Sequence, residues 1–571
     1  MSQILPNFPE PPLGEISRSQ GVLSREIAIW IESLPLANVG ETYNLVVGAL
    51  TKVNDAGLPP QENFKVLELF RRPVQYLSDA LKRHLLGMSF PLPFKASKVV
   101  AQLCDLHLAM ANGYQGICNE LLGLNSHRQD FSLLGASLHR ALKYRGQELL
   151  TAYQAYEAGL PGRWRNIHRL YETAERKGIQ LSAVKDPYLP DKQDTTIEDQ
   201  YKQILLLALA NPLRFSQPDI DVIYRLSEKW APQCRIYSYD PFHEAPHNGV
   251  VDLEGDEPPI HLAYSRTPQH TAYRILDAST LMHSLEKLIS QNPAESPTQT
   301  LHSSAMPMPG GHLLQSVIAA WGPTPGRCFS RSQPGLDEAE VGFGFDVSHR
   351  NINRRISMAN NRGNGGSGLP VERKNASPIN PALDDEASYL CSVINESAGG
   401  SCLKWSGAGE GKIRLGELLA FRHIHEPDDE WSLAVIRWLT NANSHTVKFG
   451  IQLLSPDAIP VLIRLENDQG AETECDYVKG FYLPELKATR QPDSLIVPFL
   501  LYHTNDVVTL IKDHQEHHLR LVKAIDSTPI FSRFQFAAMS ADKNQAASTA
   551  TSPTKQVDSS LSVPTRRKHR N

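Results

Sequence analysis

The stretch VINESAGGSCLKW, residues 393–405, places a turn between two strand-like flanks. Asn395 and Ser397 can bond to their own backbone, and Gly399 and Gly400 accept positive φ at little steric cost, so these residues suit a tight turn. The same residue types also suit a binding loop, because glycine lets a ligand approach the backbone while a carboxamide and a hydroxyl offer hydrogen bonds. The turn alone leaves both interpretations open.

Short strand-like segments surround this turn from about residue 338 onward. In TVKFGIQLL, residues 446–454, Val447, Phe449, Ile451 and Leu453 share one face, which is the period of a β-strand. Further strand-like segments are WSLAVIRWL (431–439), VLIRL (461–465), SLIVPFLLY (494–502), VVTLIKD (507–513), HLRLVKAI (518–525) and FSRFQFA (531–537). Many short strands with brief polar turns predict a small antiparallel β-barrel over 338–470 and a further β-strand module over 471–538.

The N-terminal half has a helical period instead. Leu134, Leu138, Leu142, Leu149 and Tyr153 fall on one stripe, and Pro or Gly breaks separate such stripes. We therefore expect a mainly α-helical region over 18–290, with a short β segment around 250–264. An extended proline-rich N-terminus over 1–17 precedes it, a linker over 291–337 follows it, and the chain ends in a disordered basic tail over 539–571.

The composition excludes several classes of protein. At 571 residues the chain should form two to four domains, and its net charge of -5 does not suggest a nucleic-acid binder. Its seven cysteines include no CxxC pair, which argues against structural zinc. The longest apolar runs, 204–210 and 495–502, are far shorter than the roughly 18 residues of a membrane span. With no signal-peptide pattern at its start, the chain is expected in the cytoplasm.

Several groups of residues could suggest a metal site or a catalytic site, but each has a simpler structural interpretation. His423 with His425, and His514 with His517 and His518, lack the HExxH frame of a zinc site, so exposed strand or hairpin histidines are expected. No G-x-S-x-G or GxxxxGK[ST] motif is present. GFGFD (342–346) is predicted to be strand or turn and PDDE (427–430) a solvated turn. Barrel packing is predicted for Trp405, Trp431, Trp438, Cys391 and Cys402. No catalytic or metal-binding residue is predicted, and the chain is not expected to be an enzyme.

Asn395, Ser397 and Gly400 match the [D/N]-x-S-x-x-G signature of PilZ domains, and the chain resembles that family beyond the turn. IRLGELLAF (413–421) resembles the family's Leu-x-x-Gly strand start, and WSLAVIRWL followed by TVKFGIQLL resembles the strand pair that closes its barrel. HRNINRR (349–355) supplies an R-x-x-x-R motif with Arg350 and Arg354. PilZ domains are receptors for the bacterial messenger cyclic di-GMP, so the resemblance implies this ligand and no other cofactor.

The resemblance also implies roles for the matching residues. Asn395, Ser397 and the Gly399–Gly400 backbone would form a platform, because an Asn carboxamide both donates to and accepts from guanine edges. Arg350 and Arg354 would form a clasp, since arginine can fork onto guanine or clamp a phosphate. The alternative basic contacts are Arg362, Arg373, Arg414 and Arg422.

The overall layout resembles receptors that promote type IV pilus assembly and surface motility. Binding is expected to order residues 350–370, which carry the arginine clasp, and the signal is expected to pass through protein–protein contacts. The partner is unidentified; the pilus-assembly or polar machinery is the candidate, with recruitment to a cell pole. The competing hypothesis is a scaffold protein whose degenerate PilZ-like barrel binds no ligand.

Overall fold

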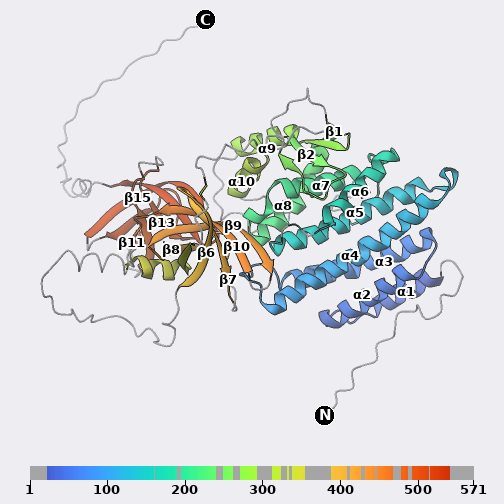
Figure 1. Ribbon diagram of the computed structural model, residues 1–571, viewed down its shortest axis with the longest axis horizontal. Helices are drawn as coiled ribbons and strands as arrows, with labels where there is room; N and C mark the ends of the chain where they lie inside the picture. The colour runs from blue at the N-terminus through green and yellow to red at the C-terminus, as the bar shows by residue number, and fades with distance from the viewer. Residues whose placement is uncertain are drawn as a thin grey trace, which may run out of the picture.

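The computed structural model describes residues 22–157, 159, 161–188, 194–239, 248–261, 271–291, 311–322, 331–332, 337–353, 388–407, 412–425, 431–443, 446–466, 477–486, 491–499, 501–512 and 515–539. Helices make up most of the N-terminal half, and two closed six-stranded antiparallel barrels follow (Figure 1). The predicted order of a mainly helical region, a small barrel and further strands is confirmed. The proline-rich start, residues 354–370 of the segment expected to become ordered, and the tail beyond 539 lie outside the described residues.

The helical region forms because apolar stripes and capping residues agree. Its helices are α1 (Val22–Glu32), α2 (Val39–Asp55), α3 (Pro60–Lys82), α4 (Phe94–Gly123), α5 (Phe131–Gln154), α6 (Arg163–Arg176), α7 (Ile197–Leu209), α8 (Gln217–Trp230) and α9 (Ser279–Gln291), with short 3-10 turns η1 (Ser126–Arg128), η2 (Pro212–Arg214) and η3 (Ala231–Gln233). Asn38 caps α2 and Asp130 caps α5, each side chain accepting a backbone N–H of the first turn.

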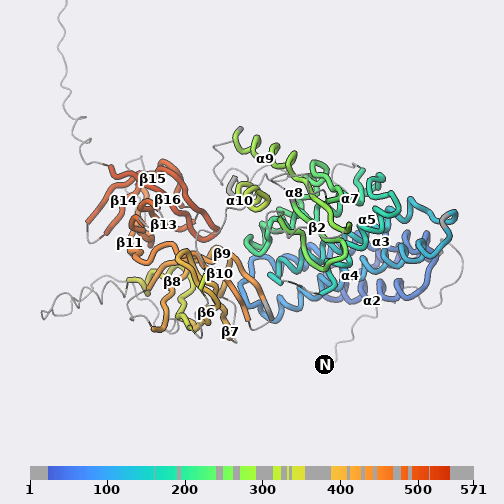
Figure 2. The backbone as a smooth tube through the Cα atoms, turned by 45° about the horizontal axis from the view of Figure 1, so that its top comes forward, coloured from blue at the N-terminus to red at the C-terminus, as the bar shows by residue number. Residues whose placement is uncertain are grey.

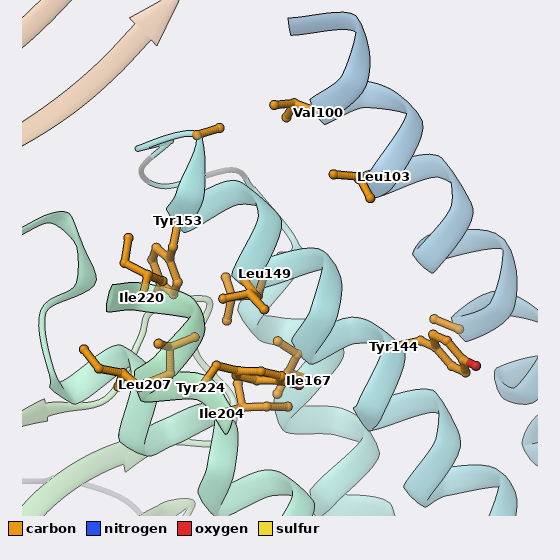
Figure 3. Close-up of a cluster of buried hydrophobic side chains, with 14 of the residues drawn as sticks. Val100, Leu103, Tyr144, Leu149, Tyr153, Ile167, Ile204, Leu207, Ile220 and Tyr224 are labelled. Carbon is orange, nitrogen blue, oxygen red and sulfur yellow. The ribbon is translucent and has the colours of Figure 1, made fainter. Parts of the chain in front are cut away.

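The stripe predicted on α5 is buried along its length, and other helices pack against it. Figure 3 shows Leu149 and Tyr153 of α5 together with side chains from α6, α7 and α8. These neighbours are Ile167, Ile204, Leu207, Ile220 and Tyr224. Each buried side chain of this size contributes about 1.5–3 kcal/mol, so this shared core holds the helices together.

Two parts of the N-terminal half are not plain helix. Strands β1 (Arg235–Ser238), β2 (Asn248–Asp252), β3 (Ile260–His261) and β4 (Tyr273–Asp277) form a sheet in the order β1-β4-β2-β3, which contains the expected short β segment. The expected linker over 291–337 contains α10 (Gly311–Trp321). Its apolar side chains at helical spacing bury Leu314, Val317 and Trp321, and the Trp321 Nε1–H donates to the Leu206 carbonyl at 3.0 Å. The Ser/Thr/Pro-rich composition around α10 concealed this spacing.

A buried ion cluster ties the loop after α6 to α3 and α5. The Asp186 carboxylate accepts hydrogen bonds from Arg71 at 2.7 and 2.9 Å and from Lys143 at 3.0 Å, and Arg140 lies 3.4 Å away. Burial alone would raise the pKa of Asp186, but the charges of Lys143, Arg140 and Arg71 outweigh it and hold the pKa well below its ordinary value. The loop is therefore fixed by charge as well as by packing.

Replacing Asp186 by Asn should lower the free energy of unfolding by about 3–5 kcal/mol, because it leaves three buried or half-buried cations without their carboxylate. Chemical denaturation at neutral pH would measure this. Glu172→Gln, which removes the partner of the exposed Arg176, is the control and should change stability by less than about 1 kcal/mol.

The Asp186 cluster also makes the stability of the folded protein depend on pH. Because the folded-state pKa of Asp186 lies below its unfolded value, the stabilisation is complete above about pH 4 and is lost as the pH falls further. The Asp186→Asn penalty should therefore shrink in acid. A penalty that is constant from pH 7 to pH 3 would contradict this assignment.

The first barrel consists of β5 (Glu338–Phe343), β6 (Tyr389–Ser397), β7 (Gly400–Ser406), β8 (Leu418–His423), β9 (Ser432–Asn443) and β10 (Thr446–Ser455), closed in the order β10-β7-β6-β5-β8-β9. The second consists of β11 (Ile459–Leu465), β12 (Val478–Leu483), β13 (Ser494–Pro498), β14 (Val507–Lys512), β15 (Gln515–Ser527) and β16 (Phe531–Ala538), closed in the order β11-β12-β13-β16-β15-β14. Because β11 pairs with β12 and β14, the boundary between the barrels lies before Ile459 and not at 470.

The first barrel contacts both other parts of the molecule. Its β8–β9 wall packs against the second barrel through Leu418, Leu433 and Phe481, with Ile352 of the helical residues 345–353 in the same cluster. On the side of the helices, Phe90 and Ile413 form a β-bridge, and the Asn441 N–H donates to the Tyr156 carbonyl at 2.9 Å. Figures 1 and 2 show β9 and β10 reaching the helical region, with the second barrel on the far side.

Candidate functional site

Residues 393–405 form the hairpin that joins β6 to β7. Ser397 and Gly400 are paired across it, so Ala398 and Gly399 form a two-residue turn. The Ser397 hydroxyl donates to the Gly400 carbonyl at 3.0 Å, and the Leu453 N–H donates to the Gly399 carbonyl at 3.1 Å. The hairpin is therefore fastened to β10 as well as closed on itself.

A β-bulge decides where the hairpin side chains point. Val393 pairs with Leu403 in the barrel core, but the register then shifts, and Asn395 pairs with Cys402. Directly paired residues share one face of a sheet, and Cys402 follows Leu403 on the opposite face. The extra residue, Ile394, thus turns Asn395 and Ser397 out of the core to the outer face of the barrel, where both are half-buried.

Gly400 lets β10 approach the hairpin closely. Its φ of 148° is disfavoured for residues with a side chain. A Cβ at this position would overlap the Ile451 carbonyl oxygen and lie 3.0 Å from Gln452 Cα. The glycine of the motif is thus required by the fold itself.

One row of the outer face continues from the motif across four strands. Asn395 of β6 pairs with Cys402 of β7, Cys402 with Gly450 of β10, and Gly450 with Trp438 of β9. The Trp438 indole lies over Gly450, since a Cβ there would overlap its Nε1. The small residue Cys402 thus lies between the Asn395 carboxamide and an aromatic ring that covers Gly450. With strands about 4.8 Å apart, the row spans about 14 Å.

Basic side chains surround this row. Ser332 and Glu396 form an antiparallel bridge through two backbone hydrogen bonds of 2.9 and 3.0 Å, which places the preceding residue, Arg331, beside Ser397. Burial raises the pKa of the Cys402 thiol, and the charges of Lys448 and Arg331 partly oppose this rise, so both cations lie near the row. Among the described residues, neither Arg331 nor Lys448 has an ion-pair partner, and the Asn395 carboxamide has no hydrogen bond.

The structure does not bring Arg350 to the hairpin. Arg350 belongs to the helical residues 345–353, which pack between the two barrels through Ile352 and Phe345. That packing uses the β8–β9 wall, which lies across the closed barrel from β6 and β7. Arg354 lies outside the described residues. Arg331 was not predicted from the sequence, although the sequence holds the same R-x-x-x-R spacing at Arg327 and Arg331, upstream of β5, and this spacing could have pointed to it.

The other side of the hairpin is held by a polar cluster. His423 Nδ1 lies 3.1 Å from Asp337 Oδ2, and its Nε2 lies 3.1 Å from Glu396 Oε1. His423 is half-buried, not exposed as expected, because its partner Ala339 faces the barrel core. The cluster holds Glu396, the residue between the two motif side chains. No group of three metal-ligating side chains occurs in the described part of the chain.

The remaining residues singled out from the sequence have varied positions. His517 and His518 are exposed on β15, whereas His514, the 427–430 turn, Arg362 and Arg373 lie outside the described residues. Arg414 is exposed, and Arg422 pairs with Glu340. GFGFD ends β5 and begins the helical residues from 345. Trp405, Trp431 and Cys391 are buried as predicted; Cys402 is buried on the outer face, and Trp438 is only half-buried.

Comparison with known proteins assigns the whole arrangement to one family. Residues 25–241 match the family model "Cyclic-di-GMP receptor FimW, N-terminal domain", residues 369–460 its "middle PilZ domain" and residues 461–539 the "FimW C-terminal beta-barrel domain". The chain belongs to this family. The chain is 25% identical over 560 residues to the Cyclic-di-GMP receptor FimW of Pseudomonas aeruginosa, covering 90% of each chain. No solved structure matches it.

The PilZ resemblance is thereby confirmed, and the family models divide the two barrels at residues 460 and 461, next to the start of β11. Separately, no helix of the described residues has the length and apolar character that crossing a membrane requires.

Gly400→Ala should destabilise the protein by about 1–3 kcal/mol, because the new methyl group overlaps the β10 backbone and the residue must hold a disfavoured φ. Thermal or urea unfolding would measure this. Gly48→Ala in α2 is the matched control: apart from its own helix backbone and chain neighbours, no atom lies within 4 Å of its Cβ position, and it should stabilise the helix by about 0.5–1 kcal/mol. Equal effects of the two substitutions would refute the close-contact argument.

Proposed function

We propose that this protein is a cyclic di-GMP receptor that binds the dinucleotide on the outer β6–β7–β10–β9 wall of its first barrel and catalyses no reaction. The observation that carries the proposal is the row from Asn395 to Trp438. It aligns the Asn395 carboxamide, the small residue Cys402 and the Trp438 ring on one face. Family membership supports the same ligand, since the relative from P. aeruginosa is named as a receptor for it.

The chemistry of the ligand matches the row and the basic side chains around it. A guanine edge can donate to and accept from the Asn395 carboxamide, and a guanine face can stack on the half-buried Trp438 indole. The phosphodiesters carry negative charge, which Arg331, Lys448 and Lys404 would attract. Lys404 and Lys448 are both exposed and paired with each other across β7 and β10. Like charges in direct opposition are unfavourable, so an anion between them would be stabilised.

Two arginine pairs compete for the role of clasp. Arg331 lies beside Ser397 on the outer face, and Arg327 precedes it at the motif spacing. The pair expected from the sequence, Arg350 and Arg354, begins on a helix against the opposite wall of the barrel. We therefore assign the clasp to Arg327 and Arg331 and keep Arg350 and Arg354 as the alternative that the experiment must test.

Calorimetric titration with cyclic di-GMP, with cyclic di-AMP and GTP as controls, tests the proposal directly. Saturable binding selective for cyclic di-GMP is expected. Trp438→Ala should weaken binding by about 5- to 150-fold, because base–aromatic stacking contributes about 1–3 kcal/mol. Trp438→Phe, which keeps an aromatic face, should retain most of the affinity. Full affinity in Trp438→Ala would exclude the row as the binding surface.

Arg331→Ala should weaken binding by about 10- to 150-fold, the range for losing a charge-assisted contact of about 1.5–3 kcal/mol. Arg350→Ala is the control within the same domain and should bind like the wild type. Arg354→Ala is measured as well, so that both arginines of the downstream pair are tested. Loss of binding in the Arg350 and Arg354 variants, with Arg331→Ala unaffected, would transfer the clasp to the downstream pair.

The output is proposed to be a protein–protein contact made in the cytoplasm, with type IV pilus assembly or surface motility as the process and a cell pole as the site of recruitment. The resemblance to pilus-promoting receptors supports this extension. The alternative function is a scaffold whose barrel binds no ligand. The close fit of Gly400 against β10 is compatible with this alternative too, because the fit stabilises the barrel with or without a ligand. Absence of heat and of thermal stabilisation with millimolar cyclic di-GMP would favour the scaffold.

A further inference from the structure

Arg437 stands where the three parts of the molecule meet. It lies at the bulge of β9, next to Trp438. Its Nε–H donates to Gln452 Oε1 at 2.7 Å, and Gln452 lies directly beside Gly400 of the hairpin. The same guanidinium pairs with Asp526 of β15 in the second barrel. One side chain thus connects the edge of the candidate binding face to the neighbouring barrel.

The helical region approaches the same place through η2. The Tyr156 hydroxyl donates to the Phe215 carbonyl at 2.9 Å, and the Tyr156 carbonyl accepts the Asn441 N–H of β9 at 2.9 Å. These two bonds hold the end of η2 alongside β9, where the two elements are in contact. Arg214, the last residue of η2, is exposed, and Arg437 belongs to β9, the strand that η2 contacts.

Positive charge is in excess at the junction. Neighbouring residues still shield part of the Arg214 side chain from water, and this partial burial lowers its pKa. The charge of Arg437 lowers the pKa further, so the two guanidinium groups interact unfavourably. Asp526 is already paired with Arg437 and also interacts with buried Arg533. Arg214 has no ion-pair partner within the described ranges. An anion placed between Arg214 and Arg437 would turn repulsion between two domains into attraction to a shared ligand.

We propose that Arg214 and Arg437 form a phosphodiester-binding contact at the Trp438 end of the row, so that the bound dinucleotide joins the helical region to the first barrel. This inference rests on the proposed function, because it concerns the same ligand on the same face. It gives the helical region a direct role in binding. It also predicts that occupancy tightens the η2–β9 junction, which is how the ligand state would reach the helices.

Arg214→Gln tests the contact, with Arg235→Gln as the matched control, since Arg235 is another exposed arginine of the N-terminal half. Calorimetry gives the affinity for cyclic di-GMP, and hydrogen exchange of the Asn441 amide reports the junction, because that amide donates to Tyr156. In the wild type and the control, cyclic di-GMP should slow exchange at Asn441. In Arg214→Gln the affinity should fall about tenfold or more and the added protection should disappear.

The ligand-free protein provides a second readout. If Arg214 only supported the fold, Arg214→Gln would lower the melting temperature; removal of a repelling charge should leave it equal or higher. A lowered melting temperature, or wild-type affinity and protection in Arg214→Gln, would overturn the inference while the receptor function stands. Protection at Asn441 by inorganic phosphate alone would also overturn it, because the contact would then not require the dinucleotide. A wild type that binds no cyclic di-GMP would remove the proposed function, and this inference with it.

Discussion

The single register shift between Val393 and Asn395 determines what the first barrel can do. A regular strand would carry Asn395 on the face of Val393, into the core, where an unpaired carboxamide costs free energy. The extra residue turns the motif side chains to the outer face without opening the barrel, because β6 stays paired with both neighbours. The bulge therefore separates a buried half of β6, which holds the fold, from an outward half, which is available to a ligand.

The β8–β9 wall and the β6–β7–β10 wall of the first barrel differ in composition and in what they contact. The β8–β9 wall is apolar and packs against the second barrel together with Ile352. The β6–β7–β10 wall carries small, polar and basic residues around Asn395, Cys402 and Gly450, and it reaches the cluster shared with the second barrel at Leu454, near the end of β10. Strand β9 belongs to both, because its first half packs against the second barrel and its far end meets η2 and Tyr156. This geometry puts Arg437 and Trp438 at the centre of the molecule.

Charge is distributed according to the same division. In the helical region Asp186 is surrounded by three cations and the cluster locks a loop. Around the candidate site, by contrast, cations lack acidic partners: among the described residues, no ion-pair partner is present for Arg331, Lys404, Lys448 or Arg214. Buried charge is tolerated where it is paired, whereas unpaired cations on an outer face are suited to an anionic ligand.

The sequence by itself determined the helical half, the small barrel and the turn at Asn395, because apolar periodicity and turn chemistry are local properties. It also carried the family motif. Only the tertiary structure decided that Arg331, and not Arg350, lies beside that motif: R-x-x-x-R occurs both at Arg327–Arg331 and at Arg350–Arg354, and the pairing of Ser332 with Glu396 brings Arg331 next to Ser397. Trp438 could not be distinguished from a core tryptophan, because its face depends on the bulge in β9. The contact of η2, which carries Arg214, with β9, which carries Arg437, joins elements more than two hundred positions apart, and only packing between domains brings them together.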